Sequence, residues 1–275
     1  MPELPEVETI RRQLDAALPG RRLVGIEASW PKTLEGRGMP AAGANGLRVS
    51  EVARRGKVLI IALGDEAALL VHLRMTGQLL LDEGGRLEGP MTRAVIHLDR
   101  GALVFNDQRK FGRIVVTPAQ LVDADPLLAR MGPEPLASDF DGSALHRQLG
   151  RHRSLSIKAA LLDQSTIAGI GNIYADEVLF CAGIHPSTPC DQLGVGDIDR
   201  LADSIIGVLQ RSIDAGGSTM RDYRDATGAQ GGYLEEAQVF GRTDERCRRC
   251  PTKIVKTRVA GRGTHLCPQC QPVRH

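Results

Sequence analysis

The feature that most restricts the fold of this chain is a pair of Cys-x-x-Cys motifs near its C-terminal end. Cys247-Arg-Arg-Cys250 is followed, after a 16-residue spacer, by Cys267-Pro-Gln-Cys270. This spacing is typical of a zinc ribbon, in which two knuckles supply four thiolates to one Zn²⁺. Four thiolates leave no open coordination position, so the ion would stabilise the fold and take no part in catalysis. We therefore predict a zinc ribbon over residues 240–275 that holds one structural Zn²⁺.

Positive charge gathers in the same segment. The 275-residue chain has a formal net charge of only +2, but basic side chains clearly outnumber acidic ones in the predicted ribbon. The basic residues in and just before the knuckles are Arg242, Arg246, Arg248, Arg249, Lys253, Lys256, Arg258 and Arg262. A concentrated positive surface favours a polyanionic partner, and nucleic acid is the usual one.

The N-terminal part of the chain is rich in β-type sequence and opens with a helix. Val7, Ile10, Leu14 and Leu18 fall on one stripe of a helix that begins near Pro5. Short runs of β-forming residues then follow up to about residue 116, which predicts an antiparallel sandwich or barrel. The clearest runs are residues 57–63, 68–73, 94–99, 102–106 and 113–117.

A stretch rich in Gly, Pro and Asp at 132–142 marks a boundary, after which the apolar spacing becomes helical. We expect helices over 156–163, 172–181 and 197–215, followed by a mobile, glycine-rich loop through residue 232. The sequence therefore predicts an α+β multidomain protein. Its domains are the β-rich domain (1–131), the helical domain (132–239) and the zinc ribbon (240–275).

Composition argues against other classes of protein. No apolar run approaches the roughly 18 residues of a membrane span, and no hydrophobic secretory segment opens the sequence. Cys181 and Cys190 lie outside the ribbon motifs without a pattern of their own, so a disulfide framework is not expected. We predict a monomeric, cytoplasmic protein that does not bind membranes.

The N-terminus carries a potential nucleophile. Removal of Met1 would expose the secondary amine of Pro2, and an α-amino group titrates near pH ~8. Such an amine can attack the C1′ atom of a sugar and form an iminium, while the neighbouring Glu3 could transfer the protons that this needs. On chemistry alone the signal is weak, because a proline before a helix is usually structural.

Motifs in other parts of the chain strengthen this reading. They are Pro2-Glu-Leu-Pro-Glu-Val-Glu-Thr9, Arg55-Gly-Lys57, His72-Leu-Arg-Met-Thr-Gly77, Asp163-Gln164, Gly169-Ile-Gly-Asn-Ile-Tyr-Ala175, Gly216-Gly-Ser-Thr-Met-Arg-Asp-Tyr223, Val239-Phe-Gly-Arg242 and the ribbon. In this order they span nearly the whole chain, which closely resembles the bacterial formamidopyrimidine-DNA glycosylases, the 8-oxoguanine DNA glycosylase/AP lyases. The resemblance implies an N-terminal β-sandwich with an N-terminal helix, a helix-two-turn-helix domain and a C-terminal zinc ribbon.

The resemblance also implies a reaction and a partner. The partner is double-stranded DNA that contains oxidised bases or abasic sites, so the protein would associate with the nucleoid when it is bound to DNA. Pro2 would be the Schiff-base nucleophile, Glu3 the proton donor in base release, and Lys57 the proton donor in β-elimination. Arg262 would grip the phosphates around the lesion and assist δ-elimination. From residue type alone, Lys57 would be interpreted as a solvated surface lysine and Arg262 as an arginine that binds phosphate without any special role.

Extruding a base from a duplex requires that the vacated stack be filled. The positions that match the family's void-filling residues are Met75, Arg109 and Phe111, although two apolar residues of this kind are more often part of a core. The positions that match backbone-binding residues are His72, Lys158 and Asn172. Arg93 could replace a family histidine that this chain lacks, and Arg153 is a further candidate that a solvated surface would equally explain.

Two alternative functions stay open at this point. The first is the related endonuclease VIII branch, which prefers oxidised pyrimidines and carries Gly where this chain has Leu4. The second is a zinc-ribbon protein that binds damaged DNA without turnover, which the presence of Pro2, Glu3 and Lys57 disfavours. Lys110 also departs from the arginine common at its position and offers fewer donors.

Overall fold

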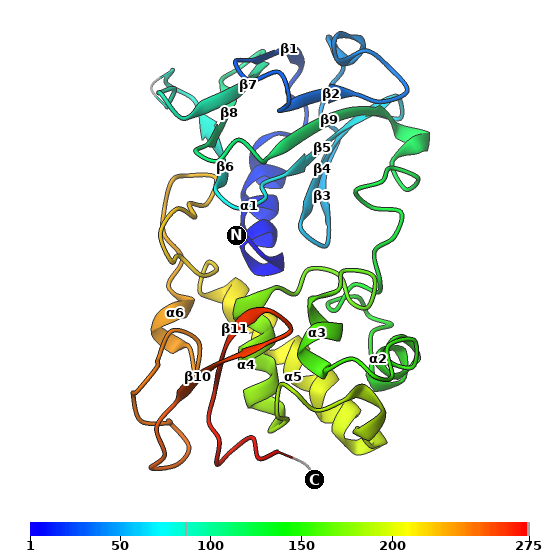
Figure 1. Cartoon of the computed structure of the whole chain (residues 1–275). Coiled ribbons are helices and arrows are strands. Elements are labelled where there is room, and N and C mark those ends of the chain that lie inside the picture. The colour runs from blue at the N-terminus through cyan, green and yellow to red at the C-terminus, as the bar shows by residue number, and fades with distance from the viewer. Residues whose placement is uncertain (86, 274–275) are drawn as a thin grey trace. The chain divides into compact units, whose positions relative to one another are not determined.

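The computed structural model describes residues 1–85 and 87–273, which form two compact units (Figure 1). The first unit contains Met1–Ala129 and Ala215–Gly232. The second contains Arg130–Asp214 and the chain from Tyr233 onward. The chain therefore leaves the first unit, returns to it for one segment and leaves it again. The predicted domain boundaries at residues 131 and 239 stay a prediction. That prediction does not place the segment 215–232 with the first unit.

The first unit begins with helix α1 (Leu4–Ala17). Val7, Ile10 and Leu14 are fully buried and, with Leu18, belong to a core cluster that contains residues of both β-sheets of the unit. This spacing of three and four residues places them on one face, as the sequence predicts. Pro5 lies in the first turn, where its missing N–H leaves no helical hydrogen bond unmade. Helix α1 packs against the hairpin formed by strands β3 (Glu51–Arg55) and β4 (Val58–Leu63).

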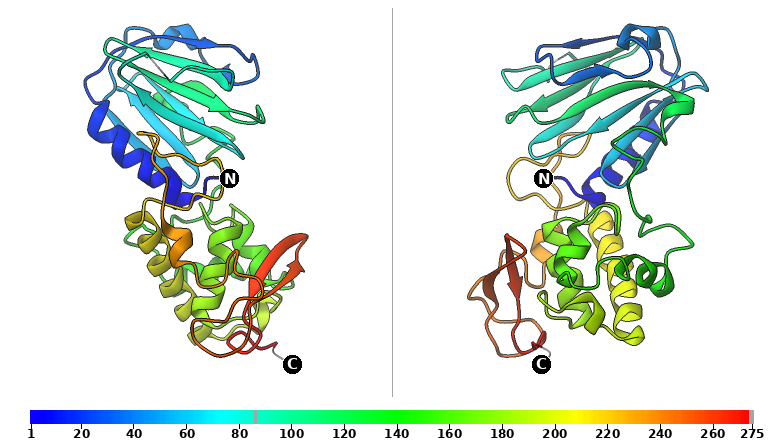
Figure 2. Two further views of the ribbon diagram at one scale, coloured as in Figure 1. Left: turned by 90° about the vertical axis from the view of Figure 1, so that its left-hand side faces the viewer. Right: turned by 45° about the vertical axis from the view of Figure 1, so that its right-hand side comes forward.

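Two sheets form the β-sandwich of this unit (Figure 2). One sheet has the strand order β1-β7-β8-β6 and the other has the order β2-β9-β5-β4-β3. The strands are β1 (Leu23–Ala28), β2 (Leu34–Gly36), β3 (Glu51–Arg55), β4 (Val58–Leu63), β5 (Ala67–His72), β6 (Gly77–Asp82), β7 (Thr92–Leu98), β8 (Ala102–Asp107) and β9 (Arg113–Pro118). Two short 3-10 helices, η1 (Ala41–Ala44) and η2 (Ala119–Leu121), lie in the connections.

One pairing corrects the prediction of an antiparallel arrangement. Strand β2 runs parallel to β9, with Leu34 paired to Ile114, whereas β3, β4, β5 and β9 pair antiparallel. A three-residue edge strand that no tight turn joins to its partner is free to pair in either direction. The central strand β5 is buried at each of its six residues.

The segment Ala215–Gly232 packs onto the first unit. The backbone N–H of Ser218 donates to the Glu6 carboxylate at 2.6 Å, and the Gln13 amide donates to Asp225 at 2.8 Å. Tyr223 and Ala226 are members of the core cluster. The structure thus gives the predicted loop side-chain hydrogen bonds and buried apolar groups, and its glycines Gly216, Gly217 and Gly228 have the positive φ angles of tight turns, while its mobility stays a prediction.

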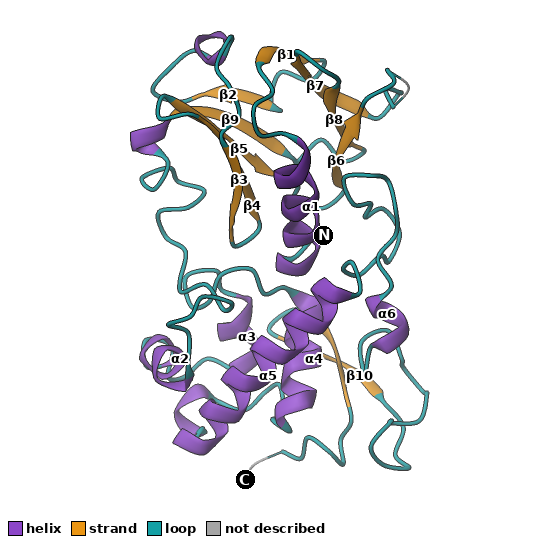
Figure 3. Cartoon of the chain, turned by 180° about the vertical axis from the view of Figure 1, so that it is seen from behind, coloured by secondary structure: helices purple, strands orange, loops and turns teal. Residues whose placement is uncertain are grey.

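The second unit contains the helices α2 (Gly142–Leu149), α3 (Ile157–Leu162), α4 (Asn172–Ala182), α5 (Val195–Asp214) and α6 (Tyr233–Glu236), with a 3-10 turn η3 (Cys190–Gln192) (Figure 3). Helix α5 packs against α2 and α4. It buries Leu201, Ile205, Val208 and Leu209, as the sequence predicts. Helix α2 was not predicted, although Asp141 caps it by accepting from the Ala144 N–H at 2.7 Å.

The same unit ends with the antiparallel hairpin β10 (Val255–Val259) and β11 (Arg262–Leu266). Ala260 and Gly261 form its two-residue turn and both have positive φ angles, as a type I′ turn requires. A small core joins the hairpin region to α4: Phe180 packs with Val239, Ile254, Cys247 and Cys267. Within the part of the chain that is described, no helix has the length and apolar character needed to cross a membrane.

Candidate functional site

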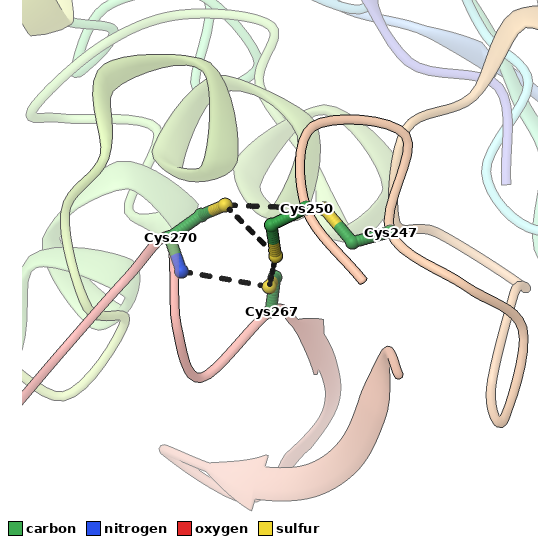
Figure 4. Close-up of side chains that lie close together, drawn as sticks. All are labelled: Cys247, Cys250, Cys267 and Cys270. Carbon is green, nitrogen blue, oxygen red and sulfur yellow. Dashed lines mark hydrogen bonds between the residues drawn. The ribbon is translucent and has the colours of Figure 1, made fainter. Parts of the chain in front are cut away.

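The four ribbon cysteines converge on one point (Figure 4). Their sulfur atoms all lie within 4.8 Å of one another. The Sγ separations are 3.9 Å for Cys247–Cys270, 3.5 Å for Cys250–Cys267 and 3.6 Å for Cys250–Cys270. Tetrahedral Zn²⁺ with Zn–S bonds of about 2.3 Å places its sulfur atoms about 3.8 Å apart, so the geometry fits one Zn²⁺ with four thiolates.

Two arginines of the first knuckle contact the helices of the second unit. Arg249 donates to the carbonyl oxygens of Phe180 and Cys181 at the end of α4 and lies over the Phe180 ring, 4.4 Å from its centroid. Arg248 donates to the carbonyl oxygens of Glu235 and Glu236. These contacts hold the first knuckle onto the helices while both arginine side chains stay exposed, and that the ribbon faces a polyanion stays a prediction. Arg262, next to the hairpin turn, is exposed.

At the start of α1, Pro2 and Glu3 are buried, and Glu3 is the N-cap residue of the helix. The Glu3 backbone N–H donates to the Glu6 carboxylate at 2.7 Å, and the two glutamates form a reciprocal capping box. Glu6 also accepts from Ser218, so one carboxylate holds both the N-terminal tip and the segment from 215 to 232. Glu6 is not among the predicted site residues, although a glutamate three residues after an N-cap is the sequence pattern of a capping box.

Lys57 lies in the two-residue turn between β3 and β4, after Gly56, and is 5% exposed. Arg54 secures this turn to α1, because its guanidinium donates to Glu8 at 3.1 Å and to the Gly56 carbonyl at 2.9 Å. Burial raises the pKa of Glu8, but hydrogen bonds from Arg11 and Arg54 outweigh it and lower the pKa overall. The turn with Lys57 and the helix that presents Pro2 are thus fixed to one another within one unit.

His72 ends β5 opposite Val58, the residue that follows Lys57. Its Nδ1 accepts a hydrogen bond from the Arg74 backbone N–H at 3.0 Å. Burial, and then the charges of Arg74 and Lys57, lower its pKa to about 3. The ring is therefore neutral at neutral pH and carries its proton on Nε2, which makes it a neutral hydrogen-bond donor.

Met75 and Phe111 are exposed despite their size, with 40% and 48% of their surface accessible. Arg109 lies against the Phe111 ring, 4.9 Å from its centroid. A core role for Met75 and Phe111, which residue type alone favours, is wrong at both positions. Large apolar side chains on loop tips are more typical of a contact surface than of a core.

The Arg93 side chain forms hydrogen bonds with nearby backbone carbonyl groups. Its guanidinium donates to the Asp107 carbonyl at 2.9 Å and to the Pro90 and Thr92 carbonyls at 3.1 and 3.2 Å. Close by is a cavity of about 220 Å³, lined by Thr76, Gln78, Met91, Asn106, Asp107, Gln108 and Asp222. The Gln78 amide donates to the Asp222 carbonyl across it. No local sequence pattern predicts this cavity, because its polar lining comes from segments far apart in the chain.

In the second unit, Asn172 is the first residue of α4, and its side-chain amide donates to the Gly263 carbonyl at 3.0 Å. Gly263 follows Arg262 in β11, so Asn172 holds the hairpin close to where Arg262 projects. Arg153 is exposed and lines a separate cavity of about 270 Å³ with His146, Cys190 and Asp191. Burial raises the pKa of the Cys190 thiol to about 11, so this thiol is unreactive at neutral pH.

Lys158, a predicted phosphate ligand, lies in the interior of the second unit. Its side chain is fully buried, and its ammonium group donates to Asp176 at 2.6 Å, to Thr264 at 2.8 Å and to the Gly263 carbonyl at 3.1 Å. Asp176 also accepts from the His265 N–H at 2.8 Å. This buried ammonium group positions the hairpin that carries Arg262, and its contact with a DNA phosphate stays a prediction.

Three family models match the chain. The formamidopyrimidine-DNA glycosylase N-terminal domain matches residues 1–114, the H2TH domain of the same proteins matches 131–224, and a zinc finger found in FPG and IleRS matches 244–273. A formamidopyrimidine-DNA glycosylase of Desulfitobacterium hafniense is 43% identical over 273 residues, which are 98% of this chain and 100% of that protein. The chain belongs to the formamidopyrimidine-DNA glycosylase family.

Solved structures of the family agree with this assignment. A Lactococcus lactis formamidopyrimidine-DNA glycosylase variant in complex with Fapy-dG-containing DNA has a TM-score of 0.91 and 40% identity, and the match covers 99% of this chain and 100% of that one. The L. lactis enzyme in complex with abasic-site DNA has a TM-score of 0.89 and 39% identity, with 98% and 100% covered. The predicted fold class, a β-sandwich with an N-terminal helix, a helix-two-turn-helix domain and a zinc ribbon, is confirmed, and the four cysteines form one structural zinc site.

Proposed function

We propose that this formamidopyrimidine-DNA glycosylase family member is a bifunctional DNA repair enzyme that excises oxidised purines, including 8-oxoguanine and formamidopyrimidines, and then cleaves the strand. The observation that carries the proposal is the N-terminal tip, in which Pro2 and Glu3 lie at the start of α1 in the unit that also contains Lys57. The related enzymes crystallised with Fapy-dG DNA and abasic-site DNA support both the substrate class and the lyase step.

In the proposed reaction the lone pair of the Pro2 nitrogen, exposed once Met1 is removed, attacks C1′ of the damaged nucleotide. The glycosidic bond breaks, and its electron pair leaves with the base, which takes up a proton. The Pro2 nitrogen loses its proton, Glu3 supplies the proton that opens the sugar ring, and the product is an iminium between Pro2 and C1′. Loss of a C2′ proton then breaks the C3′–O bond, and a second elimination breaks the C5′–O bond. Lys57 and Arg262 assist these steps, and the result is a one-nucleotide gap with phosphate ends. Water then hydrolyses the iminium, which releases the unsaturated sugar remnant and restores the Pro2 amine.

We also propose that the exposed loop residues fill the space that the extruded base leaves. Met75 and Phe111 supply apolar wedges, and Arg109 supplies donors for the unpaired base. The neutral Nε2–H of His72, Asn172 and exposed Arg262 are the proposed backbone contacts, with Arg93 and Arg153 as weaker ones. The zinc ion holds the hairpin in place and enters no chemical step. A cytoplasmic, nucleoid-associated monomer fits this role.

The test is borohydride trapping on a duplex with one 8-oxoguanine opposite cytosine, with protein whose free Pro2 N-terminus is verified by mass spectrometry. We expect a covalent adduct that maps to Pro2. Acetylation of Pro2 should abolish the adduct and strand cleavage, whereas Pro2→Gly, which keeps a primary amine, should lower the excision rate by about tenfold or more. An acetylated protein with full activity would exclude the Schiff base. Trapping only on an oxidised pyrimidine would assign the endonuclease VIII specificity, and tight binding with no adduct on either would indicate a damage sensor.

A further inference from the structure

Two loops of the first unit share a backbone feature beside each exposed apolar side chain. Met75 follows Arg74, whose φ angle is +55°, and Phe111 follows Lys110, whose φ angle is +60°. A residue with a Cβ atom rarely adopts this left-handed region, and it does so where the surrounding structure holds it there. We call residues 73–77 the Met75 loop and residues 108–112 the Phe111 loop.

One buried carboxylate contacts both loops. Asp107, at the end of β8, is 1% exposed. Its Oδ1 accepts from the Thr76 hydroxyl of the Met75 loop at 2.5 Å and from the Arg109 backbone N–H of the Phe111 loop at 3.2 Å. Its Oδ2 accepts from the Gly112 backbone N–H at 2.7 Å. The Arg109 N–H is also 3.1 Å from the Thr76 hydroxyl, so the two loops touch directly at this point.

The fit around Asp107 is close. A Cβ atom on Gly112 would lie 2.3 Å from the Phe105 ring and 3.2 Å from Asp107 Oδ2, so only glycine lets the backbone reach this carboxylate without displacing the ring. Hydrogen bonds to a carboxylate are stronger than those between neutral groups, and a buried one leaves little freedom to the groups that donate to it.

The Phe111 loop has a second anchor, which also supplies a probe. The Lys110 ammonium group lies 4.2 Å from the centroid of the Trp30 ring. Trp30 is the single tryptophan of the chain. Its fluorescence therefore reports on the Phe111 loop in the free protein, without any substrate.

We propose that Asp107 is a positioning residue that joins the Met75 loop and the Phe111 loop into one preformed wedge, so that Met75, Arg109 and Phe111 enter the duplex together when a base is extruded. This role rests on the proposed function, because it acts on the extrusion that precedes excision. Asp107 itself touches no reacting atom. It acts through the Thr76 hydroxyl and the backbone N–H groups of Arg109 and Gly112.

Two substitutions separate the contacts. Asp107→Asn keeps the shape of the side chain but offers one acceptor oxygen where the carboxylate offers two. The groups that donate to the replaced oxygen therefore lose their acceptor. Thr76→Val removes the hydroxyl alone and leaves Asp107 bound to the Phe111 loop. Asp82→Asn is the matched control, because Asp82 is also a buried carboxylate at a strand end and caps another turn by accepting from Gly84 and Leu87.

Single-turnover kinetics at saturating protein provide the main readout. For Asp107→Asn we expect excision of 8-oxoguanine to slow by about 30-fold, while cleavage of a preformed abasic site, which has no base to extrude, slows by less than about 3-fold. Thr76→Val should slow excision by about 5-fold in the otherwise wild-type protein. When Asp107→Asn is already present, adding Thr76→Val should slow excision by less than about 5-fold, because the Thr76 hydroxyl acts through Asp107. In the free protein, acrylamide should quench Trp30 more strongly in Asp107→Asn and equally in Asp82→Asn and wild type.

Several results would overturn the proposal. They are a wild-type excision rate in Asp107→Asn, an equal loss of excision and abasic-site cleavage, or a loss in Asp82→Asn as large as in Asp107→Asn. A wild-type protein that forms no adduct on 8-oxoguanine DNA would refute the proposed function instead. In that case the Trp30 measurement still decides whether Asp107 orders the loop, since it needs no substrate.

Discussion

At the residue scale, the surroundings of His72 predict a pH dependence of stability. Its folded pKa, about 3, lies below the usual value of 6.5, so the unfolded chain binds more protons between these limits. Stability therefore falls as the pH drops below about 6.5, and by pH 5 the loss from this residue should be about 2 kcal/mol. His72→Asn keeps an acceptor for the Arg74 N–H but cannot titrate. Urea unfolding at pH 7.5 and pH 5 should show a smaller acid loss for this variant; an equal loss in both proteins would assign the acid sensitivity to other groups.

Individual residue roles came from motif positions more than from residue chemistry. The type of side chain at Met75 and Phe111 favours a core, and only the motif indicated exposed loop tips. Conversely, the motif suggested phosphate binding for Lys158, and the structure buries it in a network with Asp176. No sequence pattern predicts the roles of Asp107 and Asp176, because the fold brings their hydrogen-bond partners together from distant parts of the chain.

At the scale of elements, the pair formed by Lys158 of α3 and Asp176 of α4 ties both helices to β11. Both side chains are fully buried, so removal of one charge leaves the other without compensation. We expect Asp176→Asn to lower the free energy of unfolding by roughly 3–5 kcal/mol. Asp197→Asn, which breaks a pair with half-exposed Arg200, should cost less than about 1 kcal/mol. Urea unfolding of both variants decides this, and similar costs would show that burial of the Lys158 pair does not matter.

Elements were predictable where periodicity was strong. The stripe of α1, the long apolar face of α5 and the runs that became β4, β5, β8 and β9 were all readable from residue spacing. Helix α2 was missed because its eight residues carry a short pattern that follows a loop-like Ser-Asp-Phe-Asp stretch. Strand β2 has three residues, two of them exposed, and its parallel pairing depends on contacts that no local pattern encodes.

At the scale of the whole molecule, the return of residues 215–232 to the first unit was the feature least accessible to prediction. Its glycines predict a flexible connection. The structure shows hydrogen-bond partners for the segment that lie far away in the sequence: Glu6 for Ser218, and Gln13 for Asp225 and Ala226. These hydrogen bonds join the segment to residues more than 200 positions earlier in the sequence, and a single sequence does not reveal such partners.

The last prediction concerns zinc and the independence of the two units. Cys247 and Cys267 are both ligands and members of the small core with Phe180, so loss of the ion should unfold the ribbon and loosen the end of α4. Cys247→Ser should lower the zinc content from one ion per chain to none and weaken DNA binding by about tenfold or more. Cys181→Ser, outside the ligand set, should keep both the zinc ion and DNA binding.

In Cys247→Ser, hydrogen exchange should speed up across residues 244–271 and stay unchanged in β4 and β5, because the first unit has its own core. Faster exchange in β4 and β5 would show that the fold of the first unit depends on the zinc site.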